Sequence, residues 1–88
     1  MSSPAVSIIV ASYNYEQWLP QALQSALDQY VADFELLVVD DGSTDGSLAV
    51  ARDFAARDAR VRVFTHADGG NHGLPATLAL GLSVARGR

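Results

Sequence analysis

The sequence contains no cysteine and no lysine, and each absence excludes a class of structure. Without cysteine, neither a disulfide framework nor a thiolate metal site can form. All 6 basic residues are arginine and the formal net charge is −4, so the chain has no basic cluster with which to bind a DNA or RNA backbone. One small anionic ligand held by backbone amides stays compatible with this charge.

Long apolar runs are also missing. No stretch approaches the roughly 20 residues that span a membrane, and no basic region precedes a hydrophobic one at the N-terminus, as a signal peptide requires. We therefore predict a cytoplasmic location, either free or peripheral at the inner face of the membrane. The 88 residues, of which 49% are hydrophobic and 18% charged, are typical of one small globular domain.

The apolar pattern predicts alternating strands and helices. We expect strands at Val6–Ala11, Phe34–Val39 and Val61–Thr65, and helices at about 16–29, from Thr44 or Asp45 onward, and at roughly Pro75–Arg86. The second strand has no polar alternation, which indicates a strand covered on both faces, and Arg62 indicates that the third strand lies at an edge. The order βαβαβα predicts an α/β fold, a Rossmann-like parallel sheet with helices on both faces.

The helix ends carry competing signals. For the first helix, Asn14 with Gln17 resembles a capping box, whereas Pro20 suits a first helical turn. The third helix is expected to turn a stripe toward the core, with Pro75 near its start and Gly87 as its C-cap. This stripe consists of Leu74, Leu78, Leu82 and Ala85.

Two carboxylates, Asp40 and Asp41, follow the second strand, at the sheet edge where open α/β folds bind ligands. Successive strand residues point to opposite faces, so we expect one aspartate to reach a ligand and the other to fix the loop. An Asx-turn followed by a helix cap is the alternative for this Asp-Gly-Ser-Thr segment. A calcium loop is excluded because Arg52 stands where the bidentate glutamate should be.

The end of the first strand lacks the glycines of a dinucleotide-binding fold or a P-loop. A nucleotide would bind here through side chains, with the flat face of Tyr13 for a base and polar contacts from Ser12 and Asn14. The alternative is that Tyr13 packs and Asn14 only caps a helix.

Two histidines lie in or beside the glycine-containing loop before the third helix. His66, Asp68 and His72 match no metal-ligand spacing. Residues 71–73 are either an anion site made of backbone N–H groups or a turn that starts the helix.

Taken together, these residues resemble the start of a family 2 glycosyltransferase with the GT-A fold. The resemblance is most specific at Phe34–Asp45, and it extends to Val6–Asn14, Leu23–Gln29, Asn71–Gly73 and Gly81–Gly87. It spans essentially the whole chain. It implies that residues 1–88 are a single truncated domain, the N-terminal, nucleotide-sugar-binding half of a GT-A domain.

The resemblance also implies a role for each strand end. In such proteins the residues matching Ala11 and Tyr13 line the nucleobase pocket, with the tyrosine stacked on the base. The residue matching Asp41 hydrogen-bonds the base, usually uracil, and Asp40 is expected to support the loop or to contact the nucleotide less directly. The implied activity is transfer of a sugar from a nucleotide-activated donor, typically a UDP-sugar, to a saccharide or lipid-linked acceptor, as in the synthesis of cell-envelope polysaccharide.

Parts of the family's machinery are not in this sequence. The family's Asp-x-Asp motif, which binds Mg²⁺ or Mn²⁺, would follow Arg88, and the catalytic base comes later still. The segment Leu74–Leu80 replaces a region where the family often has an arginine for the donor phosphates. We therefore expect the chain to be inactive by itself. The alternative is a stand-alone, non-catalytic nucleotide-binding or assembly module that pairs its exposed sheet edge with a partner. An unfinished sheet edge also predicts self-association of the chain.

Overall fold

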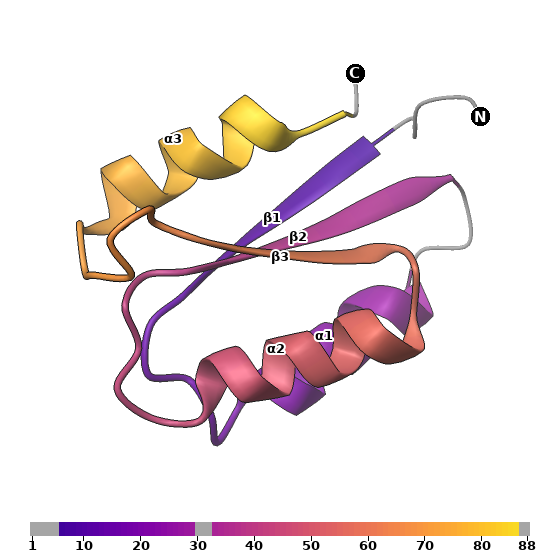
Figure 1. Ribbon diagram of the computed structural model, residues 1–88. Helices are drawn as coiled ribbons and strands as arrows, with labels where there is room; N and C mark the ends of the chain where they lie inside the picture. Colours follow the sequence, from indigo (N-terminus) through magenta and orange to yellow (C-terminus); the bar gives the residue numbers. More distant parts are fainter. Residues whose placement is uncertain (1–5, 30–32, 87–88) are drawn as a thin grey trace.

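The computed structural model describes residues 6–29 and 33–86. Its elements are β1 (Val6–Ser12), α1 (Leu19–Gln29), β2 (Phe34–Asp40), α2 (Ser47–Arg57), β3 (Val61–Thr65) and α3 (Leu74–Val84). The strands pair in parallel in the order β1-β2-β3. Helices α1 and α2 cover one face of the sheet and α3 covers the other (Figure 1). The predicted βαβαβα sheet with helices on both faces is confirmed.

Strand β2 is the central strand of the sheet, between the helices on its two faces (Figure 1). All 7 of its residues are buried, as the unbroken apolar run predicts. Its alternate residues Phe34, Leu36 and Val38 belong to the hydrophobic core on the side of α1 and α2. The helices contribute Leu19, Leu23, Leu27, Ala51 and Phe54 to the same core.

The parallel register brings the carboxyl ends of the strands to one edge. Ser12 is the partner of Asp40, which in turn is the partner of Thr65. The residues that follow, at positions 13, 41 and 66, therefore leave the sheet side by side. Within the described residues β3 pairs only with β2, so it lies at an edge, as Arg62 predicted.

Two helices begin later than the sequence pattern indicates. Helix α1 begins at Leu19, so Pro20 lies in its first turn. The capping-box alternative is wrong, because the Asn14 side chain accepts a hydrogen bond from the amide of Thr44, in the loop after β2, and does not cap α1. Helix α2 begins at Ser47, not at Thr44 or Asp45, because the residues before it are hydrogen-bonded to the loop after β1.

The predicted inner face of α3 is wrong. Its stripe residues Leu74, Leu78 and Leu82 are 59%, 38% and 69% exposed. The residues buried against the sheet are Thr77 and Gly81.

The reason is the short distance between α3 and β1. A Cβ atom built on Gly81 would lie 2.7 Å from Ile9 Cγ2, so the helix has no room for a larger side chain there. The helix ends at Val84, with Ala85 in the C-cap position. The predicted cap Gly87 lies outside the described residues.

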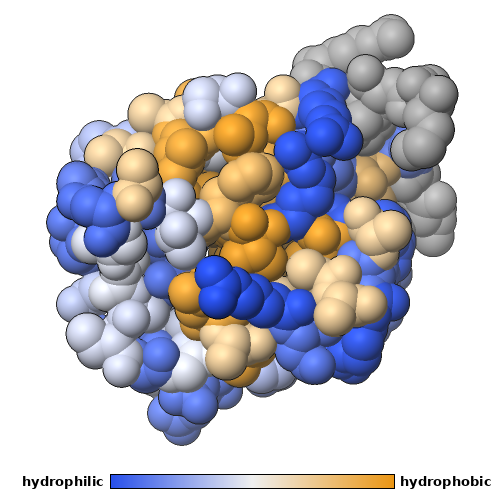
Figure 2. Space-filling view, in the orientation of Figure 1, coloured by the Kyte–Doolittle hydropathy of each residue, from blue (hydrophilic) through white to orange (hydrophobic). Residues whose placement is uncertain are grey.

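Apolar side chains also reach the surface. Figure 2 shows them as a band across the middle of one face, flanked by polar residues. Within the described part of the chain, no helix has the length and apolar character needed to cross a membrane.

Candidate nucleotide site at the carboxyl edge of the sheet

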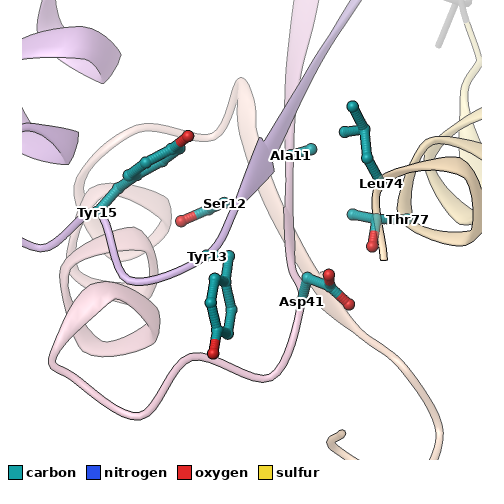
Figure 3. A pocket seen from close by; sticks show the side chains of 7 residues that line it. All are labelled: Ala11, Ser12, Tyr13, Tyr15, Asp41, Leu74 and Thr77. Carbon is teal, nitrogen blue, oxygen red and sulfur yellow. The ribbon is translucent and has the colours of Figure 1, made fainter. Parts of the chain in front are cut away.

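A pocket of about 260 Å³ opens at the carboxyl ends of β1 and β2. Its lining residues come from the end of β1 and the following loop, from the residue after β2, and from α3 (Figure 3). They are Ala11, Ser12, Tyr13, Tyr15, Asp41, Leu74 and Thr77. Three of the predicted binding residues, Ala11, Tyr13 and Asp41, thus line one pocket, and Asp40 does not.

The two neighbouring aspartates point to different sides of β2. Asp40 is buried and binds the following loop, with its Oδ2 accepting from the Ser43 amide at 3.0 Å and its Oδ1 from the Ser43 hydroxyl at 2.6 Å. Asp40 thus fixes the loop after β2 through the residue three positions on, one more than in an Asx-turn, as expected for one of the two aspartates. Asp41 faces the loop that precedes α3 and the pocket.

The Asp41 carboxylate is buried and surrounded by amide donors. Its Oδ1 accepts from the His72 amide at 2.7 Å, and its Oδ2 accepts from the Gly73 amide and from Asn71 Nδ2, both at 3.1 Å. The His72 amide is the main cause that lowers the pKa of Asp41 below its usual value, against the opposing effect of burial. The backbone N–H groups that the sequence suggested for an anion are therefore bonded to this carboxylate.

His66 completes the surroundings of Asp41. Its Nε2 lies 3.0 Å from Thr77 Oγ1 and 3.3 Å from Asp41 Oδ1. The Thr77 hydroxyl has acceptors for its own proton in the Gly73 carbonyl, at 2.9 Å, and in Asp41, and the Asp41 carboxylate can only accept. We therefore assign the proton to Nε2 of His66. His66 and Thr77 were not predicted from the sequence as neighbours of Asp41. The parallel register could have indicated His66, because Thr65 pairs with Asp40 and the next residue of each strand therefore lies at the same edge.

The loop before α3 also packs closely on Gly42. This glycine has a φ of +71°, and a Cβ atom on it would lie 2.5 Å from the Asn71 amide nitrogen. Only glycine allows both the conformation and the contact. The loops after β2 and β3 are thereby fixed against each other around Asp41.

Ser12 is the residue of the pocket with an unsatisfied polar atom. It is fully buried, and its Oγ is the buried side-chain polar atom for which the described residues provide no hydrogen-bond partner. In Figure 3 its hydroxyl points to the side of Tyr15. Such a group is available to a water molecule or a ligand atom.

A metal site does not form here. In residues 6–29 and 33–86, no group of three or more histidine, cysteine, aspartate or glutamate side chains could hold a metal ion. His72 instead contacts the ring of His66, with centroids 4.4 Å apart, and its Nε2 lies 2.8 Å from Asp68 Oδ1. These residues do not fit the Mg²⁺ or Mn²⁺ that the resemblance implies.

Comparison with known proteins now gives the class of this α/β unit. The family model "Glycosyl transferase family 2" matches residues 7–88, and the chain therefore belongs to glycosyltransferase family 2, as its motifs predicted.

Individual relatives agree with this assignment. The chain is 43% identical over 84 residues to the uncharacterized glycosyltransferase EpsJ of Bacillus subtilis (strain 168), covering 96% of this chain and 24% of that protein. It is 35% identical over 82 residues to the cholesterol galactosyltransferase of Borreliella burgdorferi, covering 93% of this chain and 22% of that protein.

A solved structure extends the comparison to the fold. The mannosyltransferase PcManGT from Pyrobaculum calidifontis, in complex with GDP-Man and Mn²⁺, superposes with a TM-score of 0.72 and 25% identity over 97% of this chain and 25% of that one. The three parallel strands and their helices thus correspond to part of a GT-A fold, which confirms the predicted fold class. The chain spans about a quarter of the length of these relatives.

Proposed function

We propose that this chain is the nucleotide-binding part of a glycosyltransferase, and that its pocket holds the base of a nucleotide-activated sugar, most simply a UDP-sugar. The observation that carries the proposal is that Tyr13 and Asp41 line the same pocket of about 260 Å³. An aromatic ring and a buried carboxylate thereby meet at the edge where open α/β sheets bind ligands.

Tyr13 would supply the stacking surface. The residue is 43% exposed, so part of the ring is free for a base. Stacking on an aromatic side chain contributes about 1–3 kcal/mol per base. Ala11 lines the same pocket and, being small, leaves space for the base beside the end of β1.

Asp41 would bind the edge of the base. A carboxylate only accepts hydrogen bonds, so it favours an edge with an N–H group, as in uracil or guanine. Its lowered pKa keeps it ionised at neutral pH. Three N–H groups of the loop and the Thr77 side chain already hydrogen-bond it, and His66 Nε2 lies 3.3 Å from its Oδ1. A base N–H group would have to displace Thr77 or His66 from the carboxylate.

The rest of the donor would need groups from elsewhere in a longer protein. Leu74 and Thr77 are the residues of α3 that line the pocket, and neither can neutralise a diphosphate. We propose that the metal, the catalytic base and the acceptor site belong to the part of the protein that corresponds to the other three-quarters of its relatives. The Mg²⁺ or Mn²⁺ would stabilise the charge of the leaving diphosphate.

Calorimetric or NMR titration of the protein with UDP, GDP and ADP tests the base pocket. We expect UDP to bind most tightly, Tyr13→Ala to weaken binding about 10-fold through lost stacking, and Tyr13→Phe to change it less than about 2-fold. Absence of binding for all three nucleotides at millimolar concentration would refute the proposal.

The stand-alone assembly module remains the alternative, and the exposed leucine face of α3 favours it. The reading frame that follows Arg88 separates the two functions. A continuation into a strand that ends in Asp-x-Asp supports the enzyme, and a stop codon supports the module.

A further inference from the structure

We propose that Asn14 is a positioning residue for Tyr13, held in a left-handed conformation by two hydrogen-bond relays that run from Asp40 and Asp45 through serine hydroxyls. The proposal rests on the nucleotide-binding function above and adds to it the residues that preorganise the stacking surface.

The first relay begins at Asp40. The Ser43 hydroxyl donates to Asp40 Oδ1 at 2.6 Å, and its oxygen accepts from the Asn14 amide at 2.9 Å. A hydroxyl that donates to a carboxylate is a stronger acceptor for the next donor in the chain. Asp40, which stays outside the pocket, thereby fixes the peptide group between Tyr13 and Asn14.

The second relay repeats this arrangement one residue later. The Ser47 hydroxyl donates to Asp45 Oδ1 at 2.5 Å and accepts from the Tyr15 amide at 2.8 Å. Ser47 is fully buried, and Asp45 is fixed further by the Glu16 amide, which donates to its Oδ2 at 3.2 Å. This relay fixes the peptide group between Asn14 and Tyr15.

The residue between the two fixed peptide groups has an unusual backbone. Asn14 has a φ of +54°, and no other non-glycine residue in the described part of the chain has a positive φ. Asparagine tolerates this region better than most residues, yet the conformation persists only where its surroundings impose it. The relays on either side impose it, and Asn14 Oδ1 adds a third bond by accepting from the Thr44 amide at 2.8 Å.

The consequence lies at the pocket. Tyr13 and Tyr15, the residues on either side of Asn14, both line it. Because the backbone between them is fixed at each peptide group, Tyr13 leaves β1 in one direction, beside Asp41 (Figure 3). The base would then find its stacking surface already ordered, which lowers the entropic cost of binding.

A double-mutant cycle on the full chain tests this coupling. Ser43→Ala removes the acceptor of the Asn14 amide, and Asn14→Gly keeps the positive φ but removes the bond to Thr44. Each is combined with Tyr13→Ala, and UDP affinity is measured by NMR titration together with the melting temperature. Ser25→Ala, on the exposed face of α1, is the matched serine control.

We expect Ser43→Ala and Asn14→Gly each to weaken UDP binding about 5-fold, as the loss of one hydrogen bond that holds Asn14 predicts. In the Tyr13→Ala background the same changes should alter the affinity less than 2-fold, because the group that they position is gone. Ser25→Ala should change neither quantity.

Other outcomes overturn the proposal in distinguishable ways. A lower melting temperature with unchanged UDP affinity means that the relays only stabilise the fold. Equal losses of affinity with and without the Tyr13 ring mean that Asn14 does not act through Tyr13. If the unmodified protein binds no nucleotide, the proposed function fails, and the positioning role fails with it.

Discussion

Two carboxylates on the α3 side of β2, one near each end of the strand, have opposite surroundings. Glu35 pairs with Arg62, whose Nη1 lies 2.7 Å from its Oε1, and it also accepts from the Ser7 hydroxyl and the Arg86 amide. Asp41 is bonded to neutral amides, and within the described residues its ion-pair contact is with His66 alone. One charge is thus neutralised by a guanidinium, and the other is held by N–H dipoles beside a pocket.

The difference separates a structural carboxylate from a candidate ligand-binding one. Burial acts to raise the pKa of Glu35, but hydrogen bonds from Ser7, Arg86 and Arg62 lower it on balance. Those partners belong to β1, to the segment after α3 and to β3, so Glu35 ties the amino end of the sheet together. Asp41 ties only the loop before α3, and its charge remains available to an incoming N–H group.

The largest expected effect is on the loop that surrounds Asp41. Gly42→Ala should destabilise the protein by roughly 2–4 kcal/mol, because alanine is strained at positive φ and its Cβ would meet the Asn71 backbone. Gly81→Ala, in α3, is the matched change. Its added Cβ would meet the Ile9 side chain, which can move, and not backbone atoms, so it should destabilise the protein less than Gly42→Ala does. Urea denaturation measures both. Equal costs would mean that the loop does not depend on Gly42.

Removing the Glu35 carboxylate should have the next largest effect on stability. Glu35→Ala leaves Arg62 half-buried without its carboxylate and should lower the free energy of unfolding by about 2–3 kcal/mol. Asp53→Ala, which breaks an exposed pair with Arg57, should cost less than about 0.5 kcal/mol. UDP affinity of the folded Glu35→Ala protein should be unchanged. A loss of affinity would contradict the division between the two carboxylates.

Removing the charge at the pocket should act mainly on binding. Asp41→Asn keeps the size of the side chain but replaces one acceptor oxygen by an NH₂ group, so we expect UDP to bind about 10-fold more weakly. Glu35→Gln is the isosteric control and should leave the affinity as it is. If titration gives Asp41→Asn the affinity of the unmodified protein, Asp41 has no part in base binding.

The smallest effect concerns acid pH. The folded pKa of Asp41 is lowered, so its contribution to stability is present above its unfolded pKa of about 3.9 and is lost as pH falls through the lower folded value. Asp41→Asn should therefore flatten the loss of stability below about pH 4. The contribution of Glu35 to stability should likewise be lost as pH falls, because its folded pKa is also lowered. It should depend more on salt, because the charge of Arg62 contributes to that shift. Thermal melts between pH 2 and pH 7 at two salt concentrations, on the order of 0.05 and 0.5 M, check both statements.

The motif Phe34–Asp45 gave the most specific part of the family prediction, and it predicted a strand covered on both faces and the separate directions of Asp40 and Asp41. Alternation along an extended chain needs no knowledge of distant residues, and this is why the two directions were predictable. The roles of Ala11, Tyr13, Asp40 and Asp41 in nucleotide binding stay predictions. The relays through Ser43 and Ser47 were not predictable, because they join loops that are far apart in the sequence.

The sequence by itself determined the alternation of strands and helices and the parallel sheet, because apolar periodicity and short connections act locally. Only the tertiary structure decided which face of α3 is buried, since the close approach of Gly81 to Ile9 turns the leucines outward. It alone also decided what Asp41 binds, because the donors come from a loop that reaches it only after β3 has joined the sheet.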